Sequence, residues 1–240
     1  MSLLNSLGFL LSVCPVFVID FLTRILALTY LFVSSKRRDL TRGNISKAFP
    51  ENTKDETDKL AFDSCRLTIE QGILTLSWSF IPTKKLLQRF TISDKSKEVL
   101  RNASKSGRGV LWLVPHFCHA ESISLVPSFL DYEKKINAIY RPFKNKALDL
   151  FIRKARQRFG MSLIGRKNGG LFKAISKIKH SETLLMLFDQ NAGAAGTRMN
   201  FMKRGCSCTT LPDVIHNRFA PVLLMVYTDR LDCLKSRIKV

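Results

Sequence analysis

The stretch GVLWLVPHFCHAES, residues 109–122, places two acid–base side chains directly after an apolar run. Residues 110–114 are all apolar, His116 follows after Pro115, and Glu121 lies five positions further on. A chain reversal after the run would bring the Glu121 carboxylate to the His116 imidazole. A carboxylate on one ring nitrogen fixes the tautomer and raises the basicity of the other. The spacing therefore predicts a general base, His116, oriented by Glu121.

Two other interpretations of this segment stay open. His116, Cys118, His119 and Glu121 are all metal-binding residue types, but the two histidines are three residues apart and no distant further ligand stands out. His116 could instead cap the helix that comes next. The sequence contains no G-x-S-x-G nucleophile motif. A base at His116 would therefore act on a hydroxyl of the substrate, and we expect neither a metal ion nor a cofactor.

The remaining pattern alternates apolar runs with helical periodicity. We expect strands at residues 110–114, 136–140, 161–164, 183–188 and 221–227, and helices at 55–80, 121–130, 147–159 and 169–178. This alternation is typical of an α/β fold, with a mixed central sheet flanked by helices. His116, Arg141 and Asp189 each follow one of these strands. Open α/β sheets bind their ligands at the carboxyl ends of strands, so the three residues are candidates for one site.

The helix predicted at 147–159 carries a basic residue on its apolar side. Leu148 and Ile152 belong to the apolar stripe, and Arg156 continues their i, i+4, i+8 ridge. An arginine directed towards a core is expected to meet an anion or a carboxylate. The alternative is an arginine that extends along the edge of the helix to reach water.

The net charge is +20, from 39 basic and 19 acidic residues among 240. Such a field attracts nucleic acid, anionic lipid headgroups or an acidic partner protein. Nucleic-acid binding is disfavoured, because the phenylalanines lie at core positions of helices and strands rather than among the basic residues. The six cysteines form no disulfide framework or zinc motif, which indicates reduced thiols in the cytosol.

The first 33 residues are mostly apolar, and their only charged side chains are Asp20 and Arg24, which are four residues apart and could pair on a helix. This length is sufficient to cross a bilayer, and an interfacial helix is the alternative. Basic residues at 36–38 favour a cytoplasmic location for the rest of the chain. We therefore expect an N-terminal membrane-anchoring helix at 1–35.

The motif H-x-x-x-x-E at His116–Glu121 resembles that of glycerolipid-type acyltransferases. Over nearly the whole chain, the sequence resembles the lipid A late acyltransferases, which are lauroyl and myristoyl transferases acting on the Kdo-bearing lipid A precursor. Matching stretches occur in the same order along the chain: an apolar N-terminus, Arg42 to Glu51, Pro115-His116-Phe117, Tyr140-Arg141-Pro142 with Asn145, Ile164-Gly165-Arg166, and Asp189-Gln190 with Gly193 and Gly196.

The resemblance implies a role for each matching residue. His116 would deprotonate the 3-hydroxyl of an acyl chain on the precursor, and the alkoxide would attack an acyl carrier protein thioester. Glu121 would orient His116, and Arg156 matches a functionally important arginine. Asp189 and Gln190 match a D-Q motif that contributes to substrate binding. Arg141 and Arg166 match basic positions that would hold substrate phosphate or the oxyanion.

The resemblance also implies a bacterial inner-membrane enzyme with its catalytic domain, residues 36–240, on the cytoplasmic side. Its partners would be acyl carrier protein and the lipid A precursor. Two departures from the family pattern are visible: Asn191 replaces the aspartate that usually follows D-Q, and family members continue beyond Val240. A C-terminally shortened, inactive membrane-associated relative is therefore an open alternative, as is an acyltransferase for another glycolipid or ornithine-type lipid.

Overall fold

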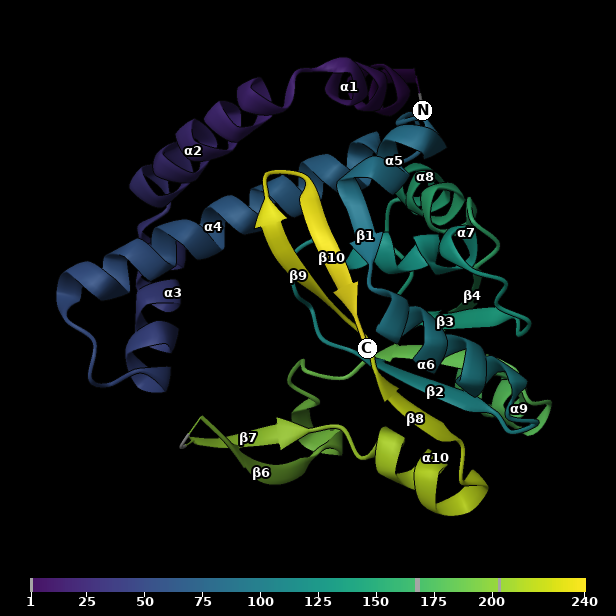
Figure 1. Cartoon of the computed structure of the whole chain (residues 1–240). Helices are drawn as coiled ribbons and strands as arrows, with labels where there is room; N and C mark the ends of the chain where they lie inside the picture. Colours follow the sequence, from purple (N-terminus) through teal and green to yellow (C-terminus); the bar gives the residue numbers. More distant parts are fainter. Residues whose placement is uncertain (1, 167–168, 203) are drawn as a thin grey trace.

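The computed structural model describes residues 2–166, 169–202 and 204–240. At its centre is a five-stranded sheet with strand order β4-β3-β5-β2-β8 (Figure 1). Every neighbouring pair in it is parallel. The strands are β2 (Val110–Val114), β3 (Ile136–Tyr140), β4 (Ser162–Gly165), β5 (Thr183–Leu187) and β8 (Val222–Met225). The predicted α/β class with a helix-flanked central sheet is confirmed, but the sheet is parallel rather than mixed, which aligns the carboxyl ends of all five strands at one edge.

Helices cover both faces of this sheet, which is why its inner strands are apolar on both sides. On one face, α9 (Gly170–Lys179) and α10 (Leu211–Phe219) contribute Ala174, Ile178 and Ile215 to a cluster with Leu111 of β2. On the other face, α6 (Asp94–Lys105) packs Leu100 against Trp112. The same face is covered by a 3₁₀ turn, η1 (Ala120–Leu125), and by α7 (Val126–Phe129), where one α-helix was expected. The helix predicted at 147–159 is α8 (Lys146–Gln157).

A second sheet has the order β1-β10-β9 and mixed strand directions. Its strands are β1 (Phe90–Ile92), β9 (Tyr227–Asp232) and β10 (Lys235–Lys239). The chain passes from β8 in the first sheet to β9 in the second through Val226, which is fully buried. The strand predicted at 221–227 is therefore present as β8 but ends earlier, at Met225: Val226 crosses the core and Tyr227 begins a strand of the second sheet.

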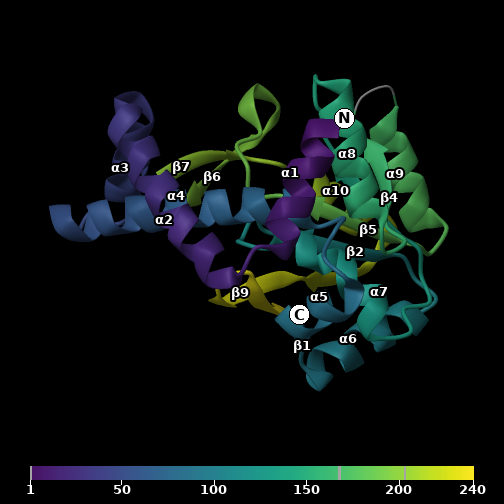
Figure 2. The same cartoon turned by 90° about the horizontal axis from the view of Figure 1, so that it is seen from above.

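The N-terminal region forms five helices: α1 (Ser2–Val13), α2 (Val16–Val33), α3 (Ser35–Ala48), α4 (Lys54–Ser77) and α5 (Thr83–Arg89). The single helix expected at 1–35 is divided at Pro15, because proline lacks the N–H that continues a helix. Both α1 and α2 lie against α4 (Figures 1 and 2). The approach of α1 is close at Gly8, where a Cβ atom would lie 2.5 Å from the backbone oxygen of Leu76.

Helix α2 exposes an apolar surface. Ile19, Thr23 and Ala27 are buried on its inner side, whereas only 17% of the Val16–Val33 window, with a mean hydropathy of 2.0, is buried overall. By length and composition it is the one helix among the described residues that could cross a membrane. The predicted pair of Asp20 and Arg24 is present at 2.8 Å, and Asp20 also accepts a hydrogen bond from Arg66 of α4 at 3.0 Å.

Beyond β5, the chain forms a two-stranded antiparallel hairpin that the sequence pattern did not predict. It consists of β6 (Thr197–Phe201) and β7 (Arg204–Cys208), and a 3₁₀ turn, η2 (Gly193–Ala195), precedes it. The hairpin projects from the body of the molecule (Figure 1).

Candidate active site

Polar side chains from four neighbouring strands follow the same edge of the parallel sheet. His116 follows β2, Asp189 follows β5, Arg141 follows β3 and Arg166 follows β4. This arrangement agrees with the expectation drawn from the strand ends. Because β5 lies beside β2 in the sheet, Asp189 and His116 become neighbours although 73 residues separate them.

The imidazole of His116 is held by Asp189. The ring Nδ1 lies 2.5 Å from Asp189 Oδ1, and the backbone N–H of His116 donates to Asp189 Oδ2 at 2.7 Å. An ionised carboxylate can only accept, so the proton lies on Nδ1 and Nε2 carries the lone pair. The His116 side chain is 41% exposed and that of Asp189 is 30% exposed. Nε2 of His116 is therefore accessible to a substrate hydroxyl.

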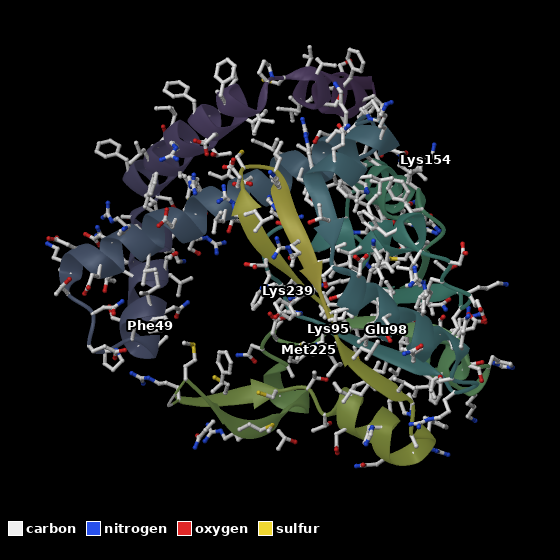
Figure 3. The ribbon with its side chains drawn as sticks, in the orientation of Figure 1. Phe49, Lys95, Glu98, Lys154, Met225 and Lys239 are labelled. Atoms are coloured by element: carbon white, nitrogen blue, oxygen red, sulfur yellow. The ribbon has the colours of Figure 1, made fainter. Side chains whose placement is uncertain are left out.

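Glu121 does not take the position expected for it. Its carboxylate binds the guanidinium of Arg156, which donates from Nε to both oxygens at 3.1 Å and from Nη2 to Oε1 at 2.7 Å. The partner expected to orient His116 is thus replaced by Asp189. The carboxylate expected for Arg156 is present, because residues 148, 152 and 156 share the inner side of α8. Lys154 of the same helix points outward to solvent (Figure 3).

Burial and charge act in opposite directions on Arg156. Burial by itself lowers the pKa of its guanidinium, but the adjacent Glu121 carboxylate raises it overall. Arg156 therefore remains a cation. Nε and Nη2 are used by Glu121, and Nη1 makes no hydrogen bond within the described part of the chain.

His116, Glu121 and Arg156 all line one cavity of about 470 Å³. Its other walls are largely apolar and include Ala138 of β3, Leu148 and Ile152 of α8, Met161 just before β4, Leu163 of β4, and Leu185 of β5. A largely apolar cavity with a few polar groups in its lining is the usual form of a site for an apolar ligand.

The loop that carries His116 is anchored by a second histidine. His119 is fully buried, with Nε2 2.7 Å from Glu70 Oε1 and Nδ1 2.6 Å from the Ser236 hydroxyl. Its backbone N–H donates to Gln71 at 2.5 Å, and its φ of 66° lies in the left-handed region. The neighbouring Cys118 carbonyl accepts from Thr228 at 2.6 Å. Helix α4 and strands β9 and β10 therefore fix the loop from three sides.

Glu70 is the centre of this buried cluster. Arg230 donates to both of its oxygens at 3.0–3.3 Å, and the Leu234 amide donates to Oε1 at 2.7 Å. Burial raises the pKa of Glu70, but hydrogen bonds from His119, Arg230 and Leu234 outweigh it and lower the pKa to about 2. The carboxylate is therefore ionised at neutral pH, and both of its oxygens accept hydrogen bonds.

Glu70, Cys118 and His119 also place three potential metal ligand atoms within 4.8 Å of one another. The hydrogen bonds of Glu70 and His119, the two neighbours of the Cys118 thiol, favour a structural role over metal binding. Glu70 and His119 are already joined by a hydrogen bond, and Arg230 supplies a positive charge at the same carboxylate. Burial and then the charge of Glu70 raise the pKa of Cys118 to about 12, so the thiol is protonated. The cluster is a closed hydrogen-bonded network.

The remaining predicted residues lie outside this cavity. Arg141 and Arg166 are exposed and follow adjacent strands whose last paired residues are Tyr140 and Gly165. The Arg166 amide donates to the Tyr140 carbonyl at 3.0 Å, which brings the two backbones together. Gln190 is exposed beside Asp189. The structure thus groups His116 with Asp189 and Glu121 with Arg156, and leaves Arg141, Arg166 and Gln190 on the surface.

Glu70, Gln71 and Arg230 were missed as site residues. The available signal was weak: a charged residue, Glu70, on the inward stripe of a helix otherwise marked by Leu67 and Leu74. Its partners, Arg230 and Leu234, lie 160 or more residues away, which no local pattern reveals.

Comparison with known proteins gives a consistent family assignment. Residues 1–232 match the family model described as bacterial lipid A biosynthesis acyltransferase. The chain is 27% identical over 179 residues to the lipid A biosynthesis palmitoleoyltransferase of Escherichia coli (strain K12). This match covers 73% of this chain and 55% of that protein. It is 24% identical over 185 residues to the lipid A biosynthesis acyltransferase of Haemophilus influenzae, covering 77% and 57%. The chain thus spans a little over half the length of these curated relatives.

Proposed function

The chain belongs to the bacterial lipid A biosynthesis acyltransferase family, and from this premise we propose that it is a membrane-associated O-acyltransferase of lipopolysaccharide biosynthesis. It would transfer a fatty acyl chain from an acyl carrier protein thioester to a hydroxyacyl group of the Kdo-lipid A precursor. The observation that carries the proposal is the Asp189-held His116 in the lining of a largely apolar cavity.

His116 is the general base. Its Nε2 takes the proton of the acceptor 3-hydroxyl while Asp189 holds Nδ1–H and stabilises the imidazolium that forms. The acceptor oxygen attacks the thioester carbonyl, forming a C–O bond and a tetrahedral oxyanion. The C–S bond then breaks, and the leaving thiolate takes the proton back from Nε2. Atoms and charge balance without a metal ion or cofactor.

Arg156 is placed to act on the developing negative charge. Glu121 fixes its guanidinium by the contacts at Nε and Nη2, so Nη1 is presented in a preorganised orientation. A preorganised donor in an apolar cavity stabilises an oxyanion more than the same donor in water. In this proposal Glu121 contributes by orienting Arg156, and the apolar walls receive the acyl chain.

Arg141 and Arg166 are proposed to hold the acceptor. Both follow neighbouring strands at the edge where His116 lies, and guanidinium groups bind phosphate by two parallel hydrogen bonds. Gln190, next to Asp189, is proposed to bind substrate as well. The basic surface as a whole favours an acidic carrier protein as donor.

Membrane association is proposed from α1 and α2, whose outer sides expose large apolar residues including Leu10, Phe17, Phe21 and Phe32. The basic residues at 36–38 then favour the cytoplasmic side of the inner membrane for the catalytic domain.

The test is acyl transfer by purified protein in detergent, with labelled acyl carrier protein thioester and Kdo-lipid A precursor. His116→Ala and Asp189→Asn are compared with His216→Ala, a matched control because His216 is exposed on α10. Transfer that the first two variants abolish and the control retains supports the proposal. Transfer unaffected by His116→Ala would falsify the role of the base.

Two further outcomes separate the alternatives. Transfer to another hydroxylated lipid but not to the precursor would reassign the acceptor. A folded wild-type protein that transfers no acyl group to any acceptor would identify an inactive member of the family.

A further inference from the structure

The β6–β7 hairpin has two chemically different faces. Alternate residues of a strand point to opposite sides, and the pairs Met199 with Cys206 and Phe201 with Arg204 share one side. The other side carries Arg198, which is paired with Ser207. Ser207 is turned towards the body, because its hydroxyl donates to the Gly193 carbonyl of η2 at 2.6 Å. The side that carries Met199 and Phe201, together with Arg204, is therefore directed away from this contact.

The apolar residues gather at the distal end of the hairpin. Phe201 is 63% exposed, Met199 is 55% exposed and Met202, in the turn, is 39% exposed. Met202 has a φ of 48°, in the left-handed region where glycine or asparagine is the usual turn residue. Folding of the hairpin alone would favour a different residue here.

The sequence of this hairpin is basic. Residues 197–208 include Arg198, Lys203 and Arg204 and contain no acidic residue. Arg198 and Arg204 are exposed. Both views place the hairpin tip near the C-terminal end of α3, where Phe49 is also exposed (Figures 1, 2 and 3). Near this end of α3, Lys47 and the acidic Glu51 are both exposed, whereas Lys36 and Arg37 lie at the other end of the helix. The basic residues next to the apolar tip are therefore those of the hairpin itself.

We propose that the hairpin tip, defined as Met199, Phe201 and Met202, docks on an anionic bilayer surface, with the apolar side chains inserted and Arg198 and Arg204 at the headgroups. Charge complementarity selects this occupant, because clustered basic residues are attracted to anionic lipids. A second copy of the chain would bring like charges together. A protein partner needs some 20 to 30 residues per side, far more than the tip offers.

The hairpin would make a membrane contact separate from α1 and α2. The hairpin begins at Thr197, eight residues after Asp189, whose carboxylate holds His116. Docking at this point would bring the edge of the sheet that carries the site towards the bilayer. Lipid insertion does not require acyl transfer, so the two proposals can fail independently.

The test uses tryptophan fluorescence of the full chain. Phe201→Trp places a reporter at the tip, and Phe172→Trp is the matched control, because Phe172 is 80% exposed on α9, which lies across the molecule from the hairpin in both views (Figures 1 and 2). The native Trp78 and Trp112 are buried and give a constant background. Each variant is mixed with vesicles of phosphatidylglycerol and phosphatidylethanolamine bearing brominated acyl chains, and then with phosphatidylcholine vesicles of the same type.

The expected result is a blue shift and bromine quenching of Phe201→Trp on the anionic vesicles, and neither for Phe172→Trp. Adding Arg198→Gln and Arg204→Gln to Phe201→Trp should reduce the quenching at a fixed lipid concentration. Unchanged Phe201→Trp emission overturns the proposal, whether or not the protein floats with the vesicles. Equal quenching by neutral vesicles also overturns it. A blue shift caused by acyl carrier protein without lipid would assign the tip to a protein partner instead.

Discussion

Two histidines three residues apart each form a pair with a carboxylate, but in opposite surroundings. His116 and Asp189 are 41% and 30% exposed, whereas His119 and Glu70 have no exposed side-chain surface. His116 has one nitrogen held and one facing a cavity. His119 has both nitrogens occupied, by Glu70 and Ser236. The same pair of residue types is therefore proposed to transfer a proton in one place and fixes a loop in the other, and the difference lies in whether a ring nitrogen remains for the substrate.

The largest expected effect comes from removing the free nitrogen. His116→Ala should lower kcat for acyl transfer by about 10²–10⁴-fold, the usual contribution of a general base, while the melting temperature changes little. Asp189→Asn should have an effect of similar kind, because an amide no longer fixes the tautomer. A matching loss in melting temperature would contradict the distinction between the two pairs.

Breaking the buried pair should destabilise the protein instead. Glu70→Gln removes the charge that balances Arg230, and loss of one member of a buried ion pair costs about 3–5 kcal/mol. The measurement is denaturant unfolding in detergent. Glu98→Gln is the control, since Glu98 is exposed on α6 (Figure 3) and should leave the free energy of unfolding unchanged. Equal stability of the two variants would show that the buried cluster does not hold the loop.

A smaller effect is expected from the Glu121–Arg156 pair. Arg156→Lys keeps the positive charge but loses the two-point contact with Glu121. A hydrogen bond to a charged group contributes about 1.5–3 kcal/mol, so acyl transfer should fall by about 10–100-fold. Acyl transfer should fall less in Glu121→Gln than in Asp189→Asn. Lys154→Gln, on the outer side of α8, should have no effect. If Glu121→Gln instead matches Asp189→Asn, Glu121 rather than Asp189 orients the base.

A further expected effect, confined to acidic solution, is a change in stability with pH. The pKa of Glu70 is lowered from 4.5 to about 2 in the folded chain, so the unfolded chain takes up its proton first as the pH falls. The stability contributed by Glu70 is complete above about pH 4.5 and is lost as the pH falls towards 2. Wild-type unfolding measured across this window should show that slope, and Glu70→Gln should lack it. A parallel slope in both proteins would assign the acid sensitivity to other carboxylates.

Local patterns were sufficient for the elements that begin and end within one stretch of sequence. The strands at 110–114 and 136–140 were predicted to the residue, because each is a largely apolar run between polar segments. The inward position of Arg156 also followed from helical spacing. The identity of the partner of His116 did not follow, because it depends on β5 lying beside β2, a spatial order that the sequence does not state.

The same limit explains the buried cluster and the hairpin. Glu70 meets Arg230 only because β9 belongs to a second sheet that also pairs β10 with β1. All five residues of β6 are exposed. Because no face of this strand is buried, it lacks the alternation of buried and exposed residues by which a strand is recognised. These elements are specified by contacts between distant segments rather than by periodicity.

Helix α4 has a practical consequence for producing this protein. One part of it supports the loop through Glu70 and Gln71, and Ile73 and Leu74 pack in a cluster with Ile19 of α2. A shortened chain beginning at Ser34, made to avoid detergent, would expose this apolar surface of α4. It should aggregate rather than dissolve. Preparations for enzymology should therefore keep residues 1–33 and supply a lipid or detergent environment for their outer surface.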